Sequence, residues 1–430
     1  MQRVGMRTVG VTASVVALLA LAACTGSKSG PGGPVSVPHS VGTDTTASGQ
    51  PSTAPSSSST PPAAPAKITI PRGHGTHINP RDPVQVDIAG GTLTSVKMTN
   101  PEGEQVKGKV SSDGTSWQNT EVLGYGRTYK IVAKGRNGDG VSTKRHTKIT
   151  TLTPSNMTLP YFNTIYGSSI ENNATYGVGM VVAVHFDESI PDKQAAEKAM
   201  TVTTSPHVDG AWYWTDDATA HWRPRHYYQP GTQVSVHANV YGRDLGSGLY
   251  GQSDESIAFK IGAKHYSVAN AKTHHVKVFF NDKLKRTMPT SMGQGGWVDG
   301  KYGKIALWTP NGIYTVINHE NPAIMSSDSY GLPASSPYGY KAEKVYWSTK
   351  ISTDGIYLHE LDTTVWAQGN TNVSHGCLNL NYTNAHWFYQ HSRVGDVVKV
   401  VKSGGPPLTV GQGGDWSVPW KTWVKGGAAA

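Results

Sequence analysis

Short alternations of apolar and polar residues, separated by turn residues, fill most of the chain from residue 67 onward. In the first stretch the alternation occurs in five runs: Lys67–Ile70, Val84–Ile88, Ser95–Met98, Tyr129–Val132 and His146–Ile149. A period of two is typical of strands with one buried face, and the Gly, Asn and Asp residues between the runs favour turns. The pattern predicts a small antiparallel β-sandwich over residues 67–152.

The next stretch, residues 153–263, repeats this pattern. A gap-free alignment of the two stretches places Trp222 on Trp117 and Gly231 on Gly126, and the alternating strand that follows also matches. A shared tryptophan, a shared turn glycine and a shared strand indicate two related immunoglobulin-like modules. The repeat therefore predicts a second sandwich directly after the first.

Two features of the second stretch are not part of the repeat. Residues 193–200 have the composition of a short helix. The aromatic run at 212–214 has two interpretations, because tryptophan and tyrosine rings stack on sugars and also fill sandwich cores or domain contacts. A core position or a domain contact is the favoured interpretation.

Residues 264–402 form a third region of mostly β pattern. Alternating runs at 275–280 and 283–285 flank Asn281-Asp282, which predicts a β-hairpin. Further strands are predicted at 312–317, 356–359 and 394–400, and a short helix at 384–389. The glycine-rich tail, residues 403–430, carries three tryptophans and is expected to pack back on this region as a cap. A tether to a partner is the alternative for the tail.

The N-terminal segment, residues 1–23, has the pattern of a targeting signal and is not expected to be part of the fold. Two arginines precede an apolar stretch at 9–23 that is short for a membrane span. The stretch ends in Leu-Ala-Ala-Cys24, which resembles a bacterial lipobox and implies cleavage before Cys24 and lipid on its sulfur. The lipid would hold the protein on the outer face of the cytoplasmic membrane. A plain secretory signal is the alternative. Residues 24–66, almost all Ser, Thr, Pro, Gly and Ala, predict a disordered tether.

Composition narrows the class of protein. The 430 residues suit two to four domains, and the 49 glycines and 26 prolines favour β structure over helix bundles. Two cysteines exclude a disulfide framework. The net charge of +9 fits a solvated basic surface better than affinity for an anionic wall polymer. No basic and aromatic stripe indicates binding to nucleic acid.

One stretch near the C-terminal end carries the candidate chemistry. Cys377 is the only cysteine besides Cys24, and His359 and His375 are close to it in sequence. A thiol becomes a strong nucleophile when a neighbouring group makes it a thiolate, and either imidazole is a candidate for that base. Gly376 lets a substrate approach the backbone, and the consecutive amides of residues 375–377 are candidate donors to an oxyanion. The alternative, a buried structural cysteine, is disfavoured because the neighbourhood is polar and glycine-rich.

This stretch resembles the signature of the L,D-transpeptidases, which are cysteine enzymes that cross-link bacterial peptidoglycan. The signature consists of His359 and the later run Ser374-His-Gly-Cys-Leu-Asn379. The resemblance extends to Met288–Met292, Ser329–Pro333 and Gly414–Trp420, and it points to the multidomain mycobacterial and actinobacterial branch. It implies a mainly β protein, with two immunoglobulin-like modules before a mostly β catalytic domain and a short C-terminal cap.

The resemblance implies a role for each residue of the signature. Cys377 is the nucleophile and His359 the general base, whose ring is oriented by the backbone carbonyl of Glu360. The family usually has a small hydroxyl residue in place of Glu360, so its carboxylate is expected either to raise the pKa of His359 or to point into solvent. His375 competes for the role of base, but the resemblance implies that it fixes the loop. Gly376 belongs to the oxyanion hole.

The resemblance also implies a set of residues that contact substrate. Tyr340 would act from a mobile lid and donate its hydroxyl to the substrate carbonyl. The other substrate-binding positions are Gly355, Asn379, Ser374 and Met325. Trp366 stands where a small residue was expected, and it is predicted to line the cleft and change its width.

The implied reaction is an acyl transfer between stem peptides. Cys377 attacks the carbonyl of the diamino acid at position three of a tetrapeptide stem, D-alanine leaves, and an amine of a second stem resolves the thioester as a 3→3 cross-link. The resemblance implies no metal and no organic cofactor, carbapenem-type β-lactams as inhibitors, and a monomer. The acceptor stays open: water would make the protein an L,D-carboxypeptidase, and a protein amine would make it an anchoring ligase. A wall-binding scaffold without activity is the non-enzyme alternative.

Two other enzyme classes do not fit the sequence. A zinc-protease H-E-x-x-H motif would begin at His359, but position 363 is threonine, so the second ligand is missing. A papain-like protease places its cysteine before its histidine, whereas here the histidine comes first.

Overall fold

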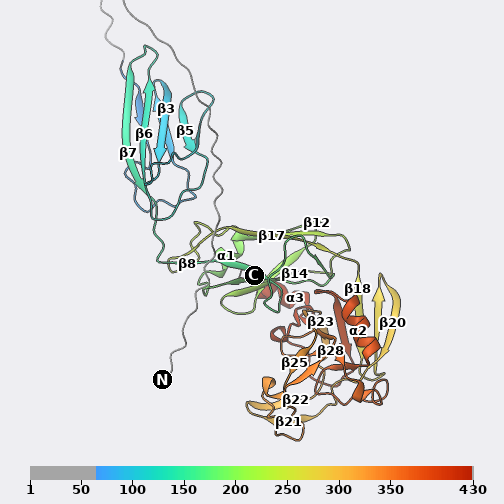
Figure 1. Ribbon diagram of the computed structural model, residues 1–430. Coiled ribbons are helices and arrows are strands. Elements are labelled where there is room, and N and C mark those ends of the chain that lie inside the picture. Colours follow the sequence, from blue (N-terminus) through green and yellow to red (C-terminus); the bar gives the residue numbers. More distant parts are fainter. Residues whose placement is uncertain (1–63, 429–430) are drawn as a thin grey trace, which may run out of the picture. The chain divides into compact units, whose positions relative to one another are not determined.

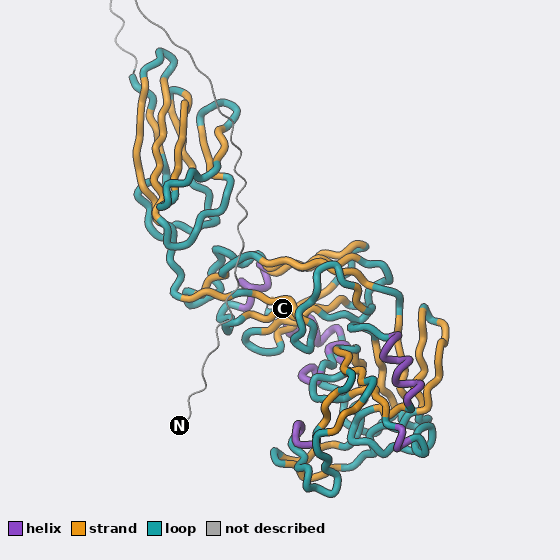
Figure 2. Tube along the Cα trace, viewed as in Figure 1, coloured by secondary structure: helices purple, strands orange, loops and turns teal. Residues whose placement is uncertain are grey.

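The computed structural model describes residues 64–428, which are mostly strands and loops (Figures 1 and 2). The predicted signal, the lipidation site Cys24 and nearly all of the predicted tether lie outside the described residues. Within residues 64–428, no helix combines the length and the apolar character that crossing a membrane requires.

The first module is a sandwich of two antiparallel sheets with strand orders β1-β2-β5-β4 and β3-β6-β7. The strands are β1 (Lys67–Thr69), β2 (Gln85–Ala89), β3 (Thr92–Thr99), β4 (Gly108–Val110), β5 (Ser116–Asn119), β6 (Thr128–Arg136) and β7 (Ser142–Thr150). Each of the five predicted runs lies in or overlaps one of these strands. Alternate residues such as Val86 and Ile131 point into a core that belongs to this module, because successive side chains of a strand face opposite sides of the sheet.

The second module is also a sandwich of two sheets, with one strand more than the first. Its strand orders are β9-β11-β14-β13 and β10-β17-β15-β12, and β10 is the parallel member of the second sheet. The strands of these sheets are β9 (Pro160–Asn163), β10 (Thr175–Tyr176), β11 (Val182–Phe186), β12 (Met200–Ser205), β13 (Gly210–Trp214), β14 (Thr219–Pro224), β15 (Gln233–Ala238) and β17 (Glu255–Ile261). A short pair, β8 (Asn156–Thr158) and β16 (Leu249–Gly251), flanks them, and the predicted helix is α1 (Lys193–Ala199).

The internal repeat predicted from the sequence is present in three dimensions. Trp117 on β5 and Trp222 on β14 are both buried, and each ring lies against a glycine of the neighbouring edge strand, Gly108 or Gly210. A Cβ at either glycine would come within 2.1 or 1.9 Å of the ring. The matched turn glycines also share a left-handed backbone, with φ of 61° and 84°. The shared tryptophan therefore packs against an edge-strand glycine in both modules.

The third domain is built around two sheets, with strand orders β20-β19-β18-β30-β23 and β24-β27-β28-β29. The strands of the first are β18 (His265–Asn270), β19 (His275–Phe280), β20 (Lys283–Pro289), β23 (Gly312–Thr315) and β30 (Val397–Val401). Those of the second are β24 (Asn318–Glu320), β27 (Ser348–Lys350), β28 (Tyr357–Glu360) and β29 (Leu378–Leu380). Two hairpins, β21 (Trp297–Gly300) with β22 (Gly303–Ala306) and β25 (Ala323–Met325) with β26 (Glu343–Val345), and helix α2 (Tyr382–His391) complete it.

The predicted hairpin and helix of this domain are confirmed. Strands β19 and β20 are joined by Asn281 and Asp282, whose φ angles are 48° and 63°. Positive φ at both central residues matches the right-handed twist of the strands that the turn connects. The main core of the domain lies between the two sheets and α2, and it includes Leu358, Leu378 and Phe388.

The C-terminal tail contacts more than was predicted. It does pack on the third domain, where Ser417 Oγ accepts a hydrogen bond of 2.7 Å from the Ile313 amide. It also covers β13 of the second module, a contact that the sequence did not indicate. Trp423, at the end of α3 (Trp420–Trp423), is fully buried, stacks on Tyr213 at 4.8 Å and donates to the Ala211 carbonyl at 2.9 Å. The tail therefore bonds to both domains.

A buried cation holds the tail in this position. The guanidinium of Arg223, on β14, lies 4.4, 4.8 and 5.4 Å from the ring centres of Trp423, Trp416 and Trp420. It donates hydrogen bonds to the carbonyls of Asp415 and Val418, at 3.1 and 2.7 Å. Burial lowers the pKa of Arg223 only to about 10, so the side chain keeps its charge at neutral pH. We call Arg223 and the three tryptophans the tail clamp.

The aromatic side chains of β13 make packing contacts within the protein. Trp214 stacks on Phe186 with ring centres 6.4 Å apart and donates its indole N–H to Glu197 at 2.7 Å. Trp212 packs against the core of the second module, and Tyr213 lies under the tail. The favoured interpretation, a core position or domain contact, is confirmed.

Candidate active site

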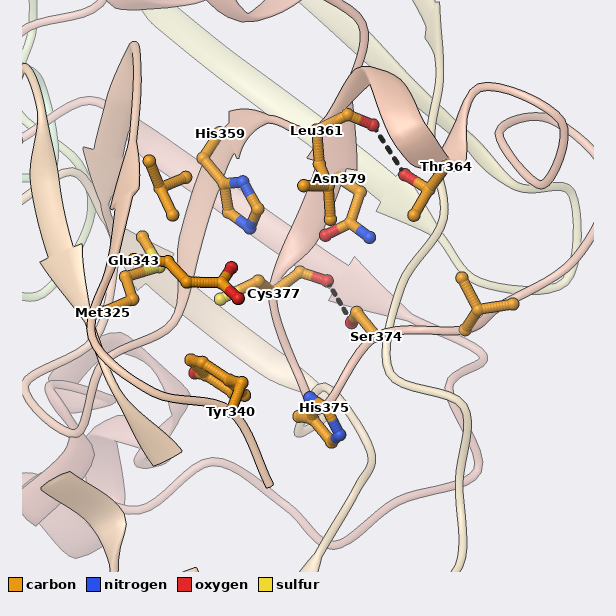
Figure 3. A pocket seen from close by; sticks show the side chains of 12 residues that line it. Met325, Tyr340, Glu343, His359, Leu361, Thr364, Ser374, His375, Cys377 and Asn379 are labelled. Carbon is orange, nitrogen blue, oxygen red and sulfur yellow. Dashed lines mark hydrogen bonds between the residues drawn. The ribbon is translucent and has the colours of Figure 1, made fainter. Parts of the chain in front are cut away.

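Two parallel neighbouring strands bring the predicted catalytic residues together. Strands β28 and β29 pair with His359 opposite Asn379, so that these two side chains share one face of the sheet. Cys377 comes two residues before Asn379, and the period of two places it on the same face. All three side chains line one cavity of about 230 Å³, into which they point (Figure 3). His359 and Cys377 are 18 positions apart in sequence, yet they meet because β28 and β29 are adjacent strands.

His359 is held in the orientation that a general base needs. Its Nδ1 lies 2.8 Å from the Glu360 carbonyl oxygen, so Nδ1–H donates to that carbonyl and Nε2 is left free toward the cavity. Burial lowers the pKa of His359 to about 4, although the bond to the carbonyl acts in the opposite direction. The ring is therefore neutral at physiological pH, with an unprotonated nitrogen available to accept a proton.

Glu360 acts through its backbone. The predicted carbonyl contact to His359 is present, whereas the carboxylate does not line the cavity. The suggestion that this carboxylate raises the pKa of His359 is wrong, because that pKa is lowered and the carboxylate is not among its causes. Neighbouring residues of a strand point to opposite faces, so a base on one face and this carboxylate on the other do not meet.

Cys377 rests as a thiol. Burial raises its pKa to about 11, and its Sγ lies 3.6 Å from the Gly355 carbonyl oxygen. A thiol beside a neutral imidazole differs from a preformed thiolate–imidazolium pair, because the proton is still on Sγ. The site thus holds Cys377 in its less reactive, protonated form.

The loop before Cys377 is fixed by two hydroxyl groups. Ser374 Oγ donates to the Cys377 carbonyl at 2.6 Å and accepts from the Gly376 amide at 3.1 Å. Thr309 Oγ1 donates to the Gly376 carbonyl at 2.7 Å. Gly376 has a φ of 149°, a backbone conformation that residues with a side chain rarely adopt. Ser374 therefore shapes the loop as well as lining the cavity.

This network bears on the predicted oxyanion donors. The Gly376 amide already donates a hydrogen bond to Ser374 Oγ, at 3.1 Å. In the described part of the chain, the amides of His375 and Cys377 have no acceptor. These two amides are the remaining backbone candidates for an oxyanion hole. The ring of His375 stacks on Tyr340 at 5.6 Å, and it has no contact that would make it the base.

Tyr340 is positioned over the nucleophile by its backbone. Ser327 Oγ accepts from its amide and donates to its carbonyl, both at 2.9 Å. Burial, with smaller contributions from Tyr330 and Cys377, raises the pKa of Tyr340 well above its usual value. The hydroxyl stays protonated and can donate a hydrogen bond to a carbonyl in the cavity (Figure 3).

A second cavity reaches Cys377 from another side. It is lined by Trp308, Tyr330, Gly355, Gly376 and Gln412, among others, and shares Tyr340, His375 and Cys377 with the first. The predicted substrate-binding residues divide between the two, because Met325, Ser374 and Asn379 line only the first cavity and Gly355 only the second. Cys377 thus lies at the junction of two cavities.

Sequence reasoning was wrong about Trp366 and missed part of the first cavity. Trp366 is 67% exposed and lines neither cavity. The lining residues that were missed are Glu343, Val345, Leu361, Thr364 and Val373. A signal for two of them was available, since Glu343 and Val345 alternate on a strand that pairs with the predicted residue Met325. Within residues 64–428, no cluster of His, Cys, Asp and Glu has the arrangement of a metal site.

The fold and the site together match two protein families. The model of the bacterial Ig domain matches residues 75–244, and the model of the L,D-transpeptidase catalytic domain, YkuD, matches residues 264–400. They define bacterial Ig modules followed by a YkuD-type catalytic domain, which confirms the predicted mainly β fold class.

Relatives cover most of the chain. It is 42% identical to L,D-transpeptidase 2 of Mycobacterium tuberculosis over 349 residues, which is 81% of each protein. It is 34% identical to L,D-transpeptidase 5 of the same species, over 85% of this chain and 77% of that one. A solved L,D-transpeptidase in complex with imipenem is 28% identical, with a TM-score of 0.46 over 56% of this chain and 99% of that one. The chain belongs to the L,D-transpeptidase family.

Proposed function

We propose that this L,D-transpeptidase works through a Cys377 acyl-enzyme and forms 3→3 cross-links between peptidoglycan stems. The observation that carries the proposal is the position of Cys377 at the junction of two cavities, beside the free Nε2 of His359. A transferase that holds a covalent intermediate needs room for a donor and for an acceptor at the same sulfur. A scaffold without activity needs neither a free base nor two routes to one thiol.

The position of His359 supports an assignment of the substrate's parts to the two cavities. His359 lines only the first cavity, and it is the group that must give a proton to the leaving amine. In the reverse direction of the same chemistry, the incoming amine must give its proton to the same nitrogen. The leaving D-alanine and the acceptor amine therefore occupy the first cavity in turn, and the acyl part of the donor stem occupies the second.

The acyl transfer then proceeds in two halves. Cys377 Sγ attacks the carbonyl carbon while His359 Nε2 takes its proton, and the oxyanion is bound by the amides of His375 and Cys377 and by the Tyr340 hydroxyl. Collapse breaks the C–N bond, and His359 protonates the departing D-alanine. An amine of a second stem then attacks the thioester, and the C–S bond breaks with return of the proton to Sγ.

The direct test is incubation of the protein with a disaccharide-tetrapeptide, followed by mass spectrometry of the products. A cross-linked dimer with loss of one D-alanine is the expected product. Tripeptide alone would identify water as the acceptor and make the protein an L,D-carboxypeptidase. No product, together with no β-lactam adduct, would overturn the proposal. Carbapenem-type β-lactams are proposed inhibitors, since imipenem is the compound in the solved relative.

The acylation rate should be almost independent of pH between about 5.5 and 8. The pKa of His359 is lowered to about 4, so the base is lost only as the pH falls through about 4. The pKa of Cys377 is raised to about 11, so the thiol does not ionise by itself in the neutral range. The measurement is the rate of carbapenem adduct formation by intact mass, with tryptophan fluorescence as a control for folding. A roughly fourfold rise between pH 6 and 8 would show a base with an ordinary histidine pKa of about 6.5.

We also propose that the protein is a lipoprotein, anchored through Cys24 to the outer face of the cytoplasmic membrane. The support is the short apolar stretch that ends in Leu-Ala-Ala-Cys24. Expressed in its bacterial host, the protein should partition into the detergent phase, and Cys24→Ala should move it to the aqueous phase. Equal partition of the two would remove lipidation from the proposal. Ser27→Ala provides a matched control near the same site.

A further inference from the structure

Glu343 is a charged residue in the first cavity that the mechanism above does not use. It lies on β26 opposite Met325, and its carboxylate points into the cavity that holds His359 and Cys377 (Figure 3). Within residues 64–428, this carboxylate has no ion-pair or hydrogen-bond partner in the protein. Its charge is therefore available to a ligand.

The rest of the cavity lining carries no charge at neutral pH. The other lining residues are apolar or neutral, apart from the two histidines. Burial lowers the pKa values of both His359 and His375, so both rings are neutral there. Figure 3 shows the Glu343 carboxylate beside Cys377 in this cavity. A cavity with one free carboxylate attracts cations.

We propose that Glu343 is a specificity-determining residue that selects an ammonium-bearing acyl acceptor, the side-chain amine of the diamino acid in a second stem. This inference rests on the proposed function and names the acceptor, which the catalytic signature leaves open. At neutral pH a primary amine arrives as a cation, and a carboxylate in the acceptor cavity binds that cation next to the thioester. Water carries no charge and gains nothing from the same residue.

The acceptor's protons have a defined route. The incoming ammonium carries three protons. One passes to the Glu343 carboxylate and from there to solvent, which leaves a neutral amine. The nitrogen then forms the C–N bond as the C–S bond breaks, a second proton moves through His359 Nε2 to Cys377 Sγ, and the third stays on the new amide. Thioester and ammonium thus give amide, thiol and one released proton.

The test compares Glu343→Gln with the unchanged chain and with Glu188→Gln. Glu188 is an exposed carboxylate of the second module, so its variant removes the same charge far from the cavity. Isothermal titration measures the affinity for a tripeptide stem with a free side-chain amine and for the same stem acetylated on that amine. Neither stem can act as a donor, because each lacks the fourth residue.

Glu343→Gln is expected to weaken binding of the free-amine stem by about fivefold, as for one partly exposed charge-assisted contact. Glu188→Gln and the acetylated stem should show no such loss. In turnover with the disaccharide-tetrapeptide, Glu343→Gln should raise KM for the acceptor and shift products from dimer toward tripeptide.

The inference would be overturned if Glu343→Gln and the unchanged chain bound the free-amine stem equally well. It would also be overturned if the unchanged chain bound the free-amine stem and the acetylated stem equally well. Failure of the proposed function would look different, because the unchanged chain would then form neither adduct nor dimer. The binding comparison decides the role of Glu343 in either case.

Discussion

Cys377→Ala is expected to abolish both cross-linking and the carbapenem adduct, with a loss of more than about a thousandfold, since a missing nucleophile leaves only binding and positioning. The side chain faces the cavities and is partly exposed, so the change should cost less than about 1 kcal/mol of stability. Intact mass after incubation with the drug is the measurement, and thermal unfolding is the control for the fold.

A matched pair of variants separates the nucleophile from its base. His359→Ala should keep the thiol but slow acylation strongly, because the pKa of about 11 leaves almost no thiolate at neutral pH. Its rate should then rise with pH, unlike that of the unchanged protein. A Cys377→Ala protein, lacking its lipidated segment, that still gains the mass of the drug would contradict the assignment of the nucleophile.

Arg223→Ala is expected to destabilise the protein by about 3–5 kcal/mol, the usual cost of removing one partner from a buried polar network. Arg223 is 2% exposed, and its loss would leave the carbonyls of Asp415 and Val418 without their donor. It would also open a void between three tryptophan rings. Urea unfolding followed by tryptophan fluorescence measures the effect directly, because those rings report on their own environment.

The neighbouring residue provides the control for the tail clamp. Arg225 lies two positions further along the chain and is exposed, so Arg225→Ala should change stability by no more than about 0.5 kcal/mol. The stability of Arg223→Lys should lie between those of Arg223→Ala and Arg225→Ala. An ammonium keeps the charge but lacks the planar guanidinium that reaches two carbonyls. Equal midpoints for Arg223→Ala and Arg225→Ala would show that the clamp contributes nothing to the stability of the fold.

Local patterns predicted the strands and the core of the catalytic site. Period-two runs indicated the sheets of both modules, and Asn281-Asp282 indicated a hairpin, because these features depend on residues next to one another in sequence. The signature around Cys377 indicated the base, the nucleophile and Asn379. These three residues meet because the strands β28 and β29 are neighbours in one sheet.

Features that depend on distant pairing were not predictable in the same way. The lining role of Glu343 depends on the pairing of β26 with β25, which leaves no mark in the sequence beyond a short alternation. Trp366 was predicted to line the cleft because of its position in the family resemblance. In the structure its side chain is exposed to solvent. The contact of the tail with the second module joins residues about two hundred positions apart, as in the bond from Trp423 to Ala211.

The tail also lines the second cavity, so the time at which this cavity forms depends on when the tail is made and folds. Pro406 and Gln412, from the tail, form part of the wall of the second cavity, and Gln412 donates to Asp354 at 2.7 Å beside the Gly355 loop. The tail follows β30 in the chain, so the sandwich modules and the sheet that carries Cys377 are synthesised before this wall is. A chain that ends a few residues after β30 would carry Cys377 and His359 but lack one side of the second cavity. Completion of the cleft is thus expected to follow the folding of both sheets in a newly made molecule.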